Sequence, residues 1–76
     1  MSRLVKRSFA LAGHRTSVAL EPEFWSALMS LGSTRGQTLG RLVAEVDAAR
    51  EPGQPLASAL RVYALLAASV SVPASS

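Results

Sequence analysis

The chain contains no cysteine, which excludes disulfides and thiolate metal sites. Its one histidine, His14, cannot form a zinc site alone, so neither a metal nor a cofactor is expected. A core built from 76 residues contributes about 3–5 kcal/mol. With disulfides and metals excluded, association is the remaining source of stability, and 49% of the residues are apolar. We therefore expect a homodimer.

Signatures of catalysis and of membrane insertion are missing as well. No G-x-S-x-G nucleophile motif occurs, and the glycines of G-S-T-R-G-Q-T-L-G lack the Lys-Ser/Thr ending of a phosphate-binding loop. No apolar run approaches the length of about 20 residues that a membrane span needs. The apolar run before Ala12 is shorter than the roughly 7–15 residues of a secretory signal. We expect a cytoplasmic protein that is neither an enzyme nor bound to membranes.

Charge is distributed unevenly along the chain. The first 15 residues hold four cations and no acid, whereas the remainder holds four arginines and five acids. A basic start before a nearly neutral body favours an anionic partner. Of the two candidates, nucleic acid and an acidic membrane surface, we expect nucleic acid. Residues 1–7 lack periodicity, and we expect them to form a flexible basic arm.

The segment R-T-S-V-A-L alternates polar and apolar residues, as a half-buried strand does. Val18 and Leu20 share one face, and the opposite face carries Arg15, Ser17 and Ala19. A weaker alternation precedes it in S-F-A-L-A. The two segments form either one long kinked strand or two shorter strands.

Helices are predicted from residue 21 onward. Pro22 suits the first turn of the first helix, and Gly36 is favoured as its left-handed C-terminal residue. Thr38 is a good N-cap for a second helix, in which apolar residues recur at helical spacing.

The stretch E-P-G-Q-P ends the second helix, and its last proline can begin a third helix over about residues 56–68. The predicted domain covers residues 8–68. A disordered tail is expected at residues 69–76, where small and polar residues predominate.

A single strand cannot satisfy its own backbone groups, so the strand that begins at Arg15 needs a partner. Two copies that pair antiparallel across a two-fold axis would supply it. The apolar face would then point into a shared core, and the polar face would line a ribbon that fits the major groove of B-DNA. The predicted dimer core consists of Val18, Leu20, Phe24, Trp25, Leu28, Leu42, Val43 and Val46.

On this hypothesis the polar face of the ribbon reads bases. Arg15 can bond guanine, Ser17 can bond several base edges, and Ala19 can contact a thymine methyl group. The basic arm and the free N–H groups at the start of the second helix would bind phosphate. The residues expected to do so are Lys6, Arg7, Thr38, Leu39 and Gly40.

The run K-R-S-F-A-L-A-G-H-R-T-S-V-A-L-E-P-E-F-W, with L-V-A-E-V-D-A-A-R and S-A-L-R-V-Y-A-L downstream, resembles a family of short bacterial ribbon-helix-helix proteins. The resemblance covers about residues 6–66. It implies a mainly α fold with an intermolecular two-stranded antiparallel β-ribbon and an additional C-terminal helix. The implied function is double-stranded DNA binding as a homodimeric transcriptional repressor. Similar proteins often carry a polar residue in place of Ala19.

A second hypothesis concerns the apolar third helix. An antitoxin-like or scaffold homodimer would use this helix mainly to bind a protein partner. Both hypotheses share the dimer and differ in what the ribbon contacts.

Overall fold

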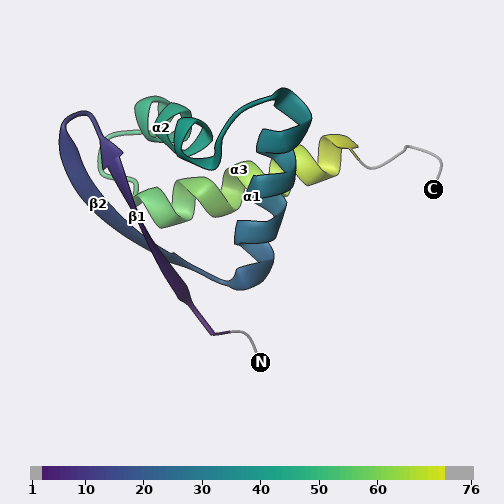
Figure 1. Ribbon diagram of the computed structural model, residues 1–76, viewed down its shortest axis with the longest axis horizontal. Helices are drawn as coiled ribbons and strands as arrows, with labels where there is room; N and C mark the ends of the chain where they lie inside the picture. The colour runs from purple at the N-terminus through teal and green to yellow at the C-terminus, as the bar shows by residue number, and fades with distance from the viewer. Residues whose placement is uncertain (1–2, 72–76) are drawn as a thin grey trace.

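The structure, a computed structural model, describes residues 3–71. A two-stranded sheet precedes three helices along the chain (Figure 1). The elements are β1 (Val5–Leu11), β2 (His14–Leu20), α1 (Pro22–Arg35), α2 (Leu39–Ala49) and α3 (Leu56–Ser71). The predicted mainly helical fold, with a two-stranded antiparallel sheet and a third helix, is confirmed.

β1 and β2 form an antiparallel hairpin within the chain. Ala12 and Gly13 make its two-residue turn with φ of 51° and 81°, the left-handed backbone that a type I′ turn requires. The pairing begins with Val5 opposite Leu20 and continues to the turn. Of the two arrangements that the sequence left open, two short strands are therefore correct. The expectation that β2 has no partner within its own chain is wrong, because the weakly alternating segment before Gly13 supplies one.

The boundaries of two predicted terminal segments also change. Val5, Lys6 and Arg7 belong to β1 and not to a flexible arm, since pairing with β2 orders a run that has no alternation of its own. At the other end, α3 continues to Ser71, so it is three residues longer than predicted. Residues 1–2 of the predicted arm and 72–76 of the predicted tail lie outside the described residues.

The hydrophobic core lies between the inner face of the hairpin and the three helices. β1 contacts α2, β2 contacts α3, and the helices contact one another. All residues predicted for the dimer core are buried here except Phe24, which is half-buried. Side chains from β1 and α3 complete this core within one chain, namely Leu11, Leu56, Ala59, Leu60 and Ala64.

The loop between α1 and α2 has the capping chemistry that the sequence predicts. Gly36 has φ of 70°, and the N–H of Gln37 donates to the carbonyl of Gly32 at 2.7 Å, which closes α1 in a Schellman motif. The hydroxyl of Thr38 then accepts a hydrogen bond from the N–H of Arg41 at 3.1 Å and caps α2. Both predicted helix boundaries are confirmed.

Gly32 lies against the backbone of this loop, which gives a testable difference between two glycines. A Cβ on Gly32 would lie 2.9 Å from the Gln37 carbonyl oxygen, whereas a Cβ on Gly40 meets nothing within 4 Å. We expect Gly32→Ala to lower the free energy of unfolding by about 1–3 kcal/mol through overpacking. Gly40→Ala should raise it by about 0.4–1 kcal/mol. Urea denaturation followed by circular dichroism measures both, and stabilisation by both variants would contradict the close approach at Gly32.

Candidate nucleic-acid interface

The outer face of the hairpin is polar and exposed, while its inner face is apolar. Side chains alternate between the faces of a strand, so the burial of Val18 and Leu20 fixes which residues point outward. The register then brings three cross-strand pairs onto the outer face, which are Lys6–Ala19, Ser8–Ser17 and Ala10–Arg15. All six residues are exposed except Ala19, which is half-buried.

The outer face thus joins residues that sequence reasoning selected with residues that it missed. Arg15, Ser17 and Ala19 share this face as predicted from their alternation. Ser8 and Ala10 were not selected, because the segment that contains them gave only a weak strand signal. Phe9 and Leu11 point inward, so their alternation along β1 is the signal that could have placed Ser8 and Ala10 on the outer face.

Small side chains occupy the middle of the outer face. The hydroxyls of Ser8 and Ser17 lie 3.1 Å apart and share a hydrogen bond in which either can donate. Arg15 lies opposite Ala10, and among residues 3–71 its guanidinium bonds to no other side chain. A ribbon with short side chains and one free guanidinium can approach a base edge closely and offer hydrogen bonds to it.

Arg7 is separated from Lys6 by the alternation of β1. Its guanidinium lies 5.6 Å from the centre of the Trp25 ring, and Phe9 contacts the same ring at 5.8 Å. The indole N–H of Trp25 donates to the Val5 carbonyl at 2.8 Å. Of the two cations predicted to bind phosphate from the arm, Lys6 lies on the outer face and Arg7 on the opposite one.

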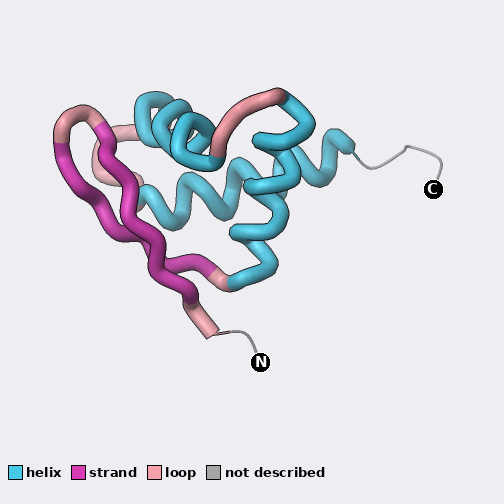
Figure 2. Tube along the Cα trace, viewed as in Figure 1, coloured by secondary structure: helices cyan, strands magenta, loops and turns pink. Residues whose placement is uncertain are grey.

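The start of α2 lies apart from the outer face of the hairpin. Figure 2 shows α2 beginning at the loop from α1 and running toward the hairpin turn. Within the described residues, the N–H groups of Leu39 and Gly40 donate to no other group of the protein, whereas Thr38 caps the next N–H. The predicted phosphate-binding N–H groups are therefore free, but one chain does not bring them to its own ribbon.

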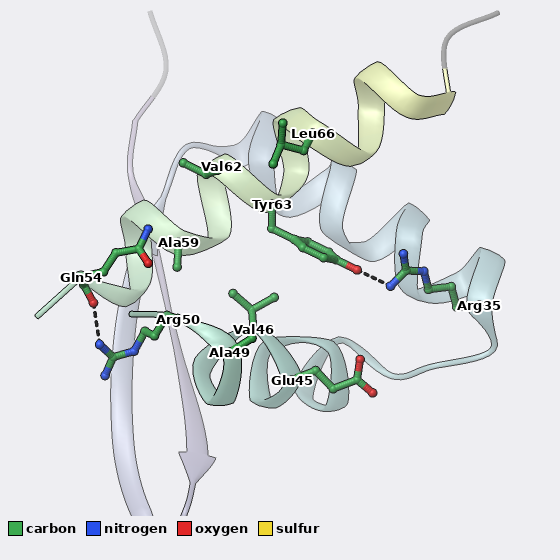
Figure 3. Close-up of a pocket in the computed structure, with 10 residues that line it drawn as sticks. All are labelled: Arg35, Glu45, Val46, Ala49, Arg50, Gln54, Ala59, Val62, Tyr63 and Leu66. Carbon is green, nitrogen blue, oxygen red and sulfur yellow. Dashed lines mark hydrogen bonds between the residues drawn. The ribbon is translucent and has the colours of Figure 1, made fainter. Parts of the chain in front are cut away.

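A groove of about 430 Å³ runs between α2 and α3 (Figure 3). Val46, Val62 and Leu66 form part of its apolar lining, and a hydrogen bond from Arg35 to the Tyr63 hydroxyl lies at one end. On α3 the side chains of Val62, Leu65 and Leu66 are 45%, 63% and 60% exposed. This surface of α3 is the largest concentration of exposed aliphatic side chains among the described residues.

The charged side chains of the helices are engaged in structural pairs. Arg61 of α3 binds Glu21 with Nε–Oε1 and Nη2–Oε2 distances of 3.0 and 3.4 Å. The pKa of Glu21 lies below its ordinary value, first because of a backbone hydrogen bond at Glu21 and then because of the bond from Arg61. Arg41 and Glu45, one turn apart on α2, form the surface pair that their spacing predicts at 3.9 Å. Arg41 and Arg61 are thus each paired with a carboxylate of their own chain.

Residues 3–71 contain no cluster of three or more histidine or acidic side chains arranged to hold a metal. His14 lies exposed at the start of β2, beside the hairpin turn. Across the same residues, no helix combines the length and apolar character needed to traverse a bilayer.

A family model described as the ribbon-helix-helix domain matches residues 4–68. A comparison with curated proteins found no match, and neither did a comparison with solved structures. The matched residues include both strands, α1 and α2, and most of α3. The chain therefore belongs to the ribbon-helix-helix domain family, whose members generally bind DNA as transcription regulators or antitoxins.

Proposed function

We propose that this protein is a homodimeric transcription regulator of the repressor type, which binds double-stranded DNA by inserting its ribbon into the major groove. The observation that carries the proposal is the outer face of the hairpin. Arg15 and Ser17 are exposed there, while the intervening Val18 is 4% exposed on the other face. The reading side chains are thus held on a packed scaffold, as sequence recognition requires.

Each residue of the face has a role that its chemistry supports. The major groove of B-DNA is about 12 Å wide and admits a two-stranded ribbon. Arg15 can make a bidentate contact with guanine, Ser17 can bond a base edge, and the methyl group of Ala19 suits a thymine methyl. Lys6, at the open end of the ribbon, is placed to neutralise phosphate.

A second copy of the chain is part of the proposal for two reasons. The exposed aliphatic side chains of α3 offer a surface that association would cover. A second chain can also bring further groups to DNA, because the N–H groups at the start of α2 lie away from the ribbon of their own chain. In the dimer we assign phosphate contacts to Arg7, Thr38, Leu39 and Gly40 as well as Lys6.

Selection of bound sequences from random duplex DNA tests the function. We expect the full-length protein to enrich an inverted repeat, because two-fold symmetric dimers bind symmetric operators. Sedimentation of the protein with the enriched duplex should give two chains per site. Recovery of random sequences only would contradict sequence-dependent binding, and one chain on the complete site would contradict the homodimer.

The groove between α2 and α3 favours a second candidate function. Its aliphatic lining suits the apolar face of a helix from a protein partner, the mode in which amphipathic helices bind grooves. An antitoxin-like or scaffold homodimer of this kind would use α3 more than the ribbon. A stable dimer that enriches no DNA sequence would favour it over the regulator.

A further inference from the structure

We infer that the groove between α2 and α3 binds an acidic amphipathic helix of a different protein, in which a carboxylate pairs with Arg35. The inference rests on the second candidate function and deepens it, because it names the chemistry of the partner. It does not depend on what the ribbon binds, since the residues that line the groove lie outside the hairpin.

The first argument is the shape of the apolar lining. On α3 the lining residues Ala59, Val62, Tyr63 and Leu66 recur at the i, i+3, i+4 and i+7 positions of one helix face. Seven residues of helix rise about 10 Å, so this lining extends over about two turns. An apolar groove of that length suits the i, i+4 and i+7 side chains of a second helix. A strand is disfavoured, because the backbone groups within a helix are already bonded to each other and offer no edge.

The second argument is the cation at one end of the groove. The Arg35 guanidinium donates a hydrogen bond to the Tyr63 hydroxyl and lies 5.6 Å from the centre of the Tyr63 ring (Figure 3). Among residues 3–71 it forms no ion pair with a carboxylate. Tyr63 therefore positions an unpaired guanidinium beside an apolar lining. A carboxylate on the occupant would form charge-assisted hydrogen bonds with it.

The other charged side chains of the groove already have partners. Glu45 accepts a hydrogen bond from the Gln37 amide at 2.6 Å and lies 3.9 Å from Arg41. At the other end of the groove, Arg50 binds Asp47 at 2.9 Å (Figure 3). Of the charged groups that line this groove in the described part of the chain, one cation thus remains without a carboxylate. An acidic occupant would neutralise that cation, whereas a basic occupant would be repelled by it.

A second copy of α3 does not supply this chemistry. Residues 56–71 contain no acid and one cation, Arg61, so an α3 helix in the groove would bring no carboxylate to Arg35. Leu65 is the most exposed of the aliphatic side chains on α3, and it does not line the groove. Two chains that associate through Leu65 can therefore leave the groove open. The charge favours a different protein as the occupant.

Selection from a displayed library of helix-forming peptides tests the inference. The probe is an alanine-rich helix of about 15 residues in which the positions of one face are randomised. On the immobilised full-length protein, we expect enrichment of aliphatic residues at i, i+4 and i+7, with glutamate or aspartate at one end of this series. Enrichment of no peptide, or of aliphatic peptides without an acid, would overturn the inference.

Variants of the apolar lining locate the peptide on the protein. Leu66→Ser should weaken binding of the enriched peptide by roughly 10-fold, because an aliphatic side chain is no longer buried by the complex. Met29→Ser removes an exposed apolar side chain of α1 outside the groove and should leave the affinity unchanged. Fluorescence anisotropy measures both, and far-UV circular dichroism confirms that both variants are folded. Equal losses for the two variants would place the peptide elsewhere and overturn the inference.

A double-mutant cycle tests the charge pair. Arg35→Gln should weaken binding of the acidic peptide by roughly 2- to 5-fold, as expected for an exposed ion pair. Replacing the acid of the peptide by glutamine should weaken binding to the wild-type protein by the same factor, and should cost nothing more on Arg35→Gln. Arg3→Gln controls for the loss of one positive charge and should leave the affinity unchanged. Independent losses in the cycle would contradict the pairing with Arg35.

The outcomes separate this inference from the proposed regulator. If the protein enriches a DNA sequence but no acidic helix, the inference fails while the regulator stands. If it enriches the acidic helix but no DNA sequence, the regulator fails and the inference stands. If no peptide is enriched and Leu66→Ser lowers the sedimentation mass of the protein alone, a second copy covers the groove, which also overturns the inference.

Discussion

Substitution of Trp25 by alanine is expected to unfold the protein. The indole is 3% exposed and donates a hydrogen bond to the Val5 carbonyl. The Phe9 ring packs against it at a tilt, and the Arg7 guanidinium lies over it. Removal of a buried tryptophan typically costs about 3–5 kcal/mol. A domain of this size has about 3–5 kcal/mol of stability from its core, so the loss is comparable to the whole. Far-UV circular dichroism at 25 °C should show loss of helix.

Trp25→Phe is the matched control for this prediction. It keeps an aromatic ring in the core and removes the donor to Val5, so we expect a folded protein that unfolds at lower urea concentration. Proteolysis should then begin at β1, because that strand loses its fixed end. A Trp25→Ala protein with wild-type stability would show that the indole does not hold β1 against the helices.

Replacement of Arg15 by alanine should remove sequence discrimination while the fold persists. The side chain is exposed on the outer face, so its loss creates no cavity. A good arginine–guanine contact contributes about 1–3 kcal/mol of discrimination. Affinity for the preferred duplex should therefore fall by roughly 5- to 150-fold per contact, whereas affinity for random duplex falls much less. Fluorescence anisotropy with both duplexes measures the ratio.

Arg50→Ala controls for the loss of one positive charge. Arg50 follows α2, where it pairs with Asp47 at 2.9 Å, so it does not lie on the ribbon. We expect this variant to keep the ratio of specific to random binding. Equal losses on both duplexes for Arg15→Ala would make Arg15 a phosphate contact and remove it from the reading face.

The helices of this fold are largely predictable from local chemistry. Gly36 and Thr38 mark two helix ends because their backbone or side-chain properties satisfy specific N–H and C=O groups. These requirements act within a few residues, so the sequence contains all the information needed. The face of β2 on which Arg15 and Ser17 lie was also predictable from local sequence, because these residues alternate with the apolar Val18 and Leu20 along the strand.

The partner of β2 was not predictable in the same way. Alternation of polar and apolar residues indicates that a segment forms a strand. The pattern is the same whether the strand that pairs with it lies in the same chain or in another. Val5 to Arg7 lack alternation altogether, and they form a strand because β2 and Trp25 engage them from a distance in sequence. Tertiary contacts override local preference here. Ser8 was therefore not predicted as a site residue, although it lies directly opposite Ser17.

A hairpin that contains both strands also changes what a single substitution does to the outer face. In a ribbon of two identical strands, one substitution alters two positions at once, so every new contact is duplicated whether or not it is favourable. Here Ser8 and Ser17 occupy separate codons on one chain and face each other once per ribbon. Each can change without the other. A single substitution on this face therefore changes one side of a cross-strand pair and leaves the other side as it was.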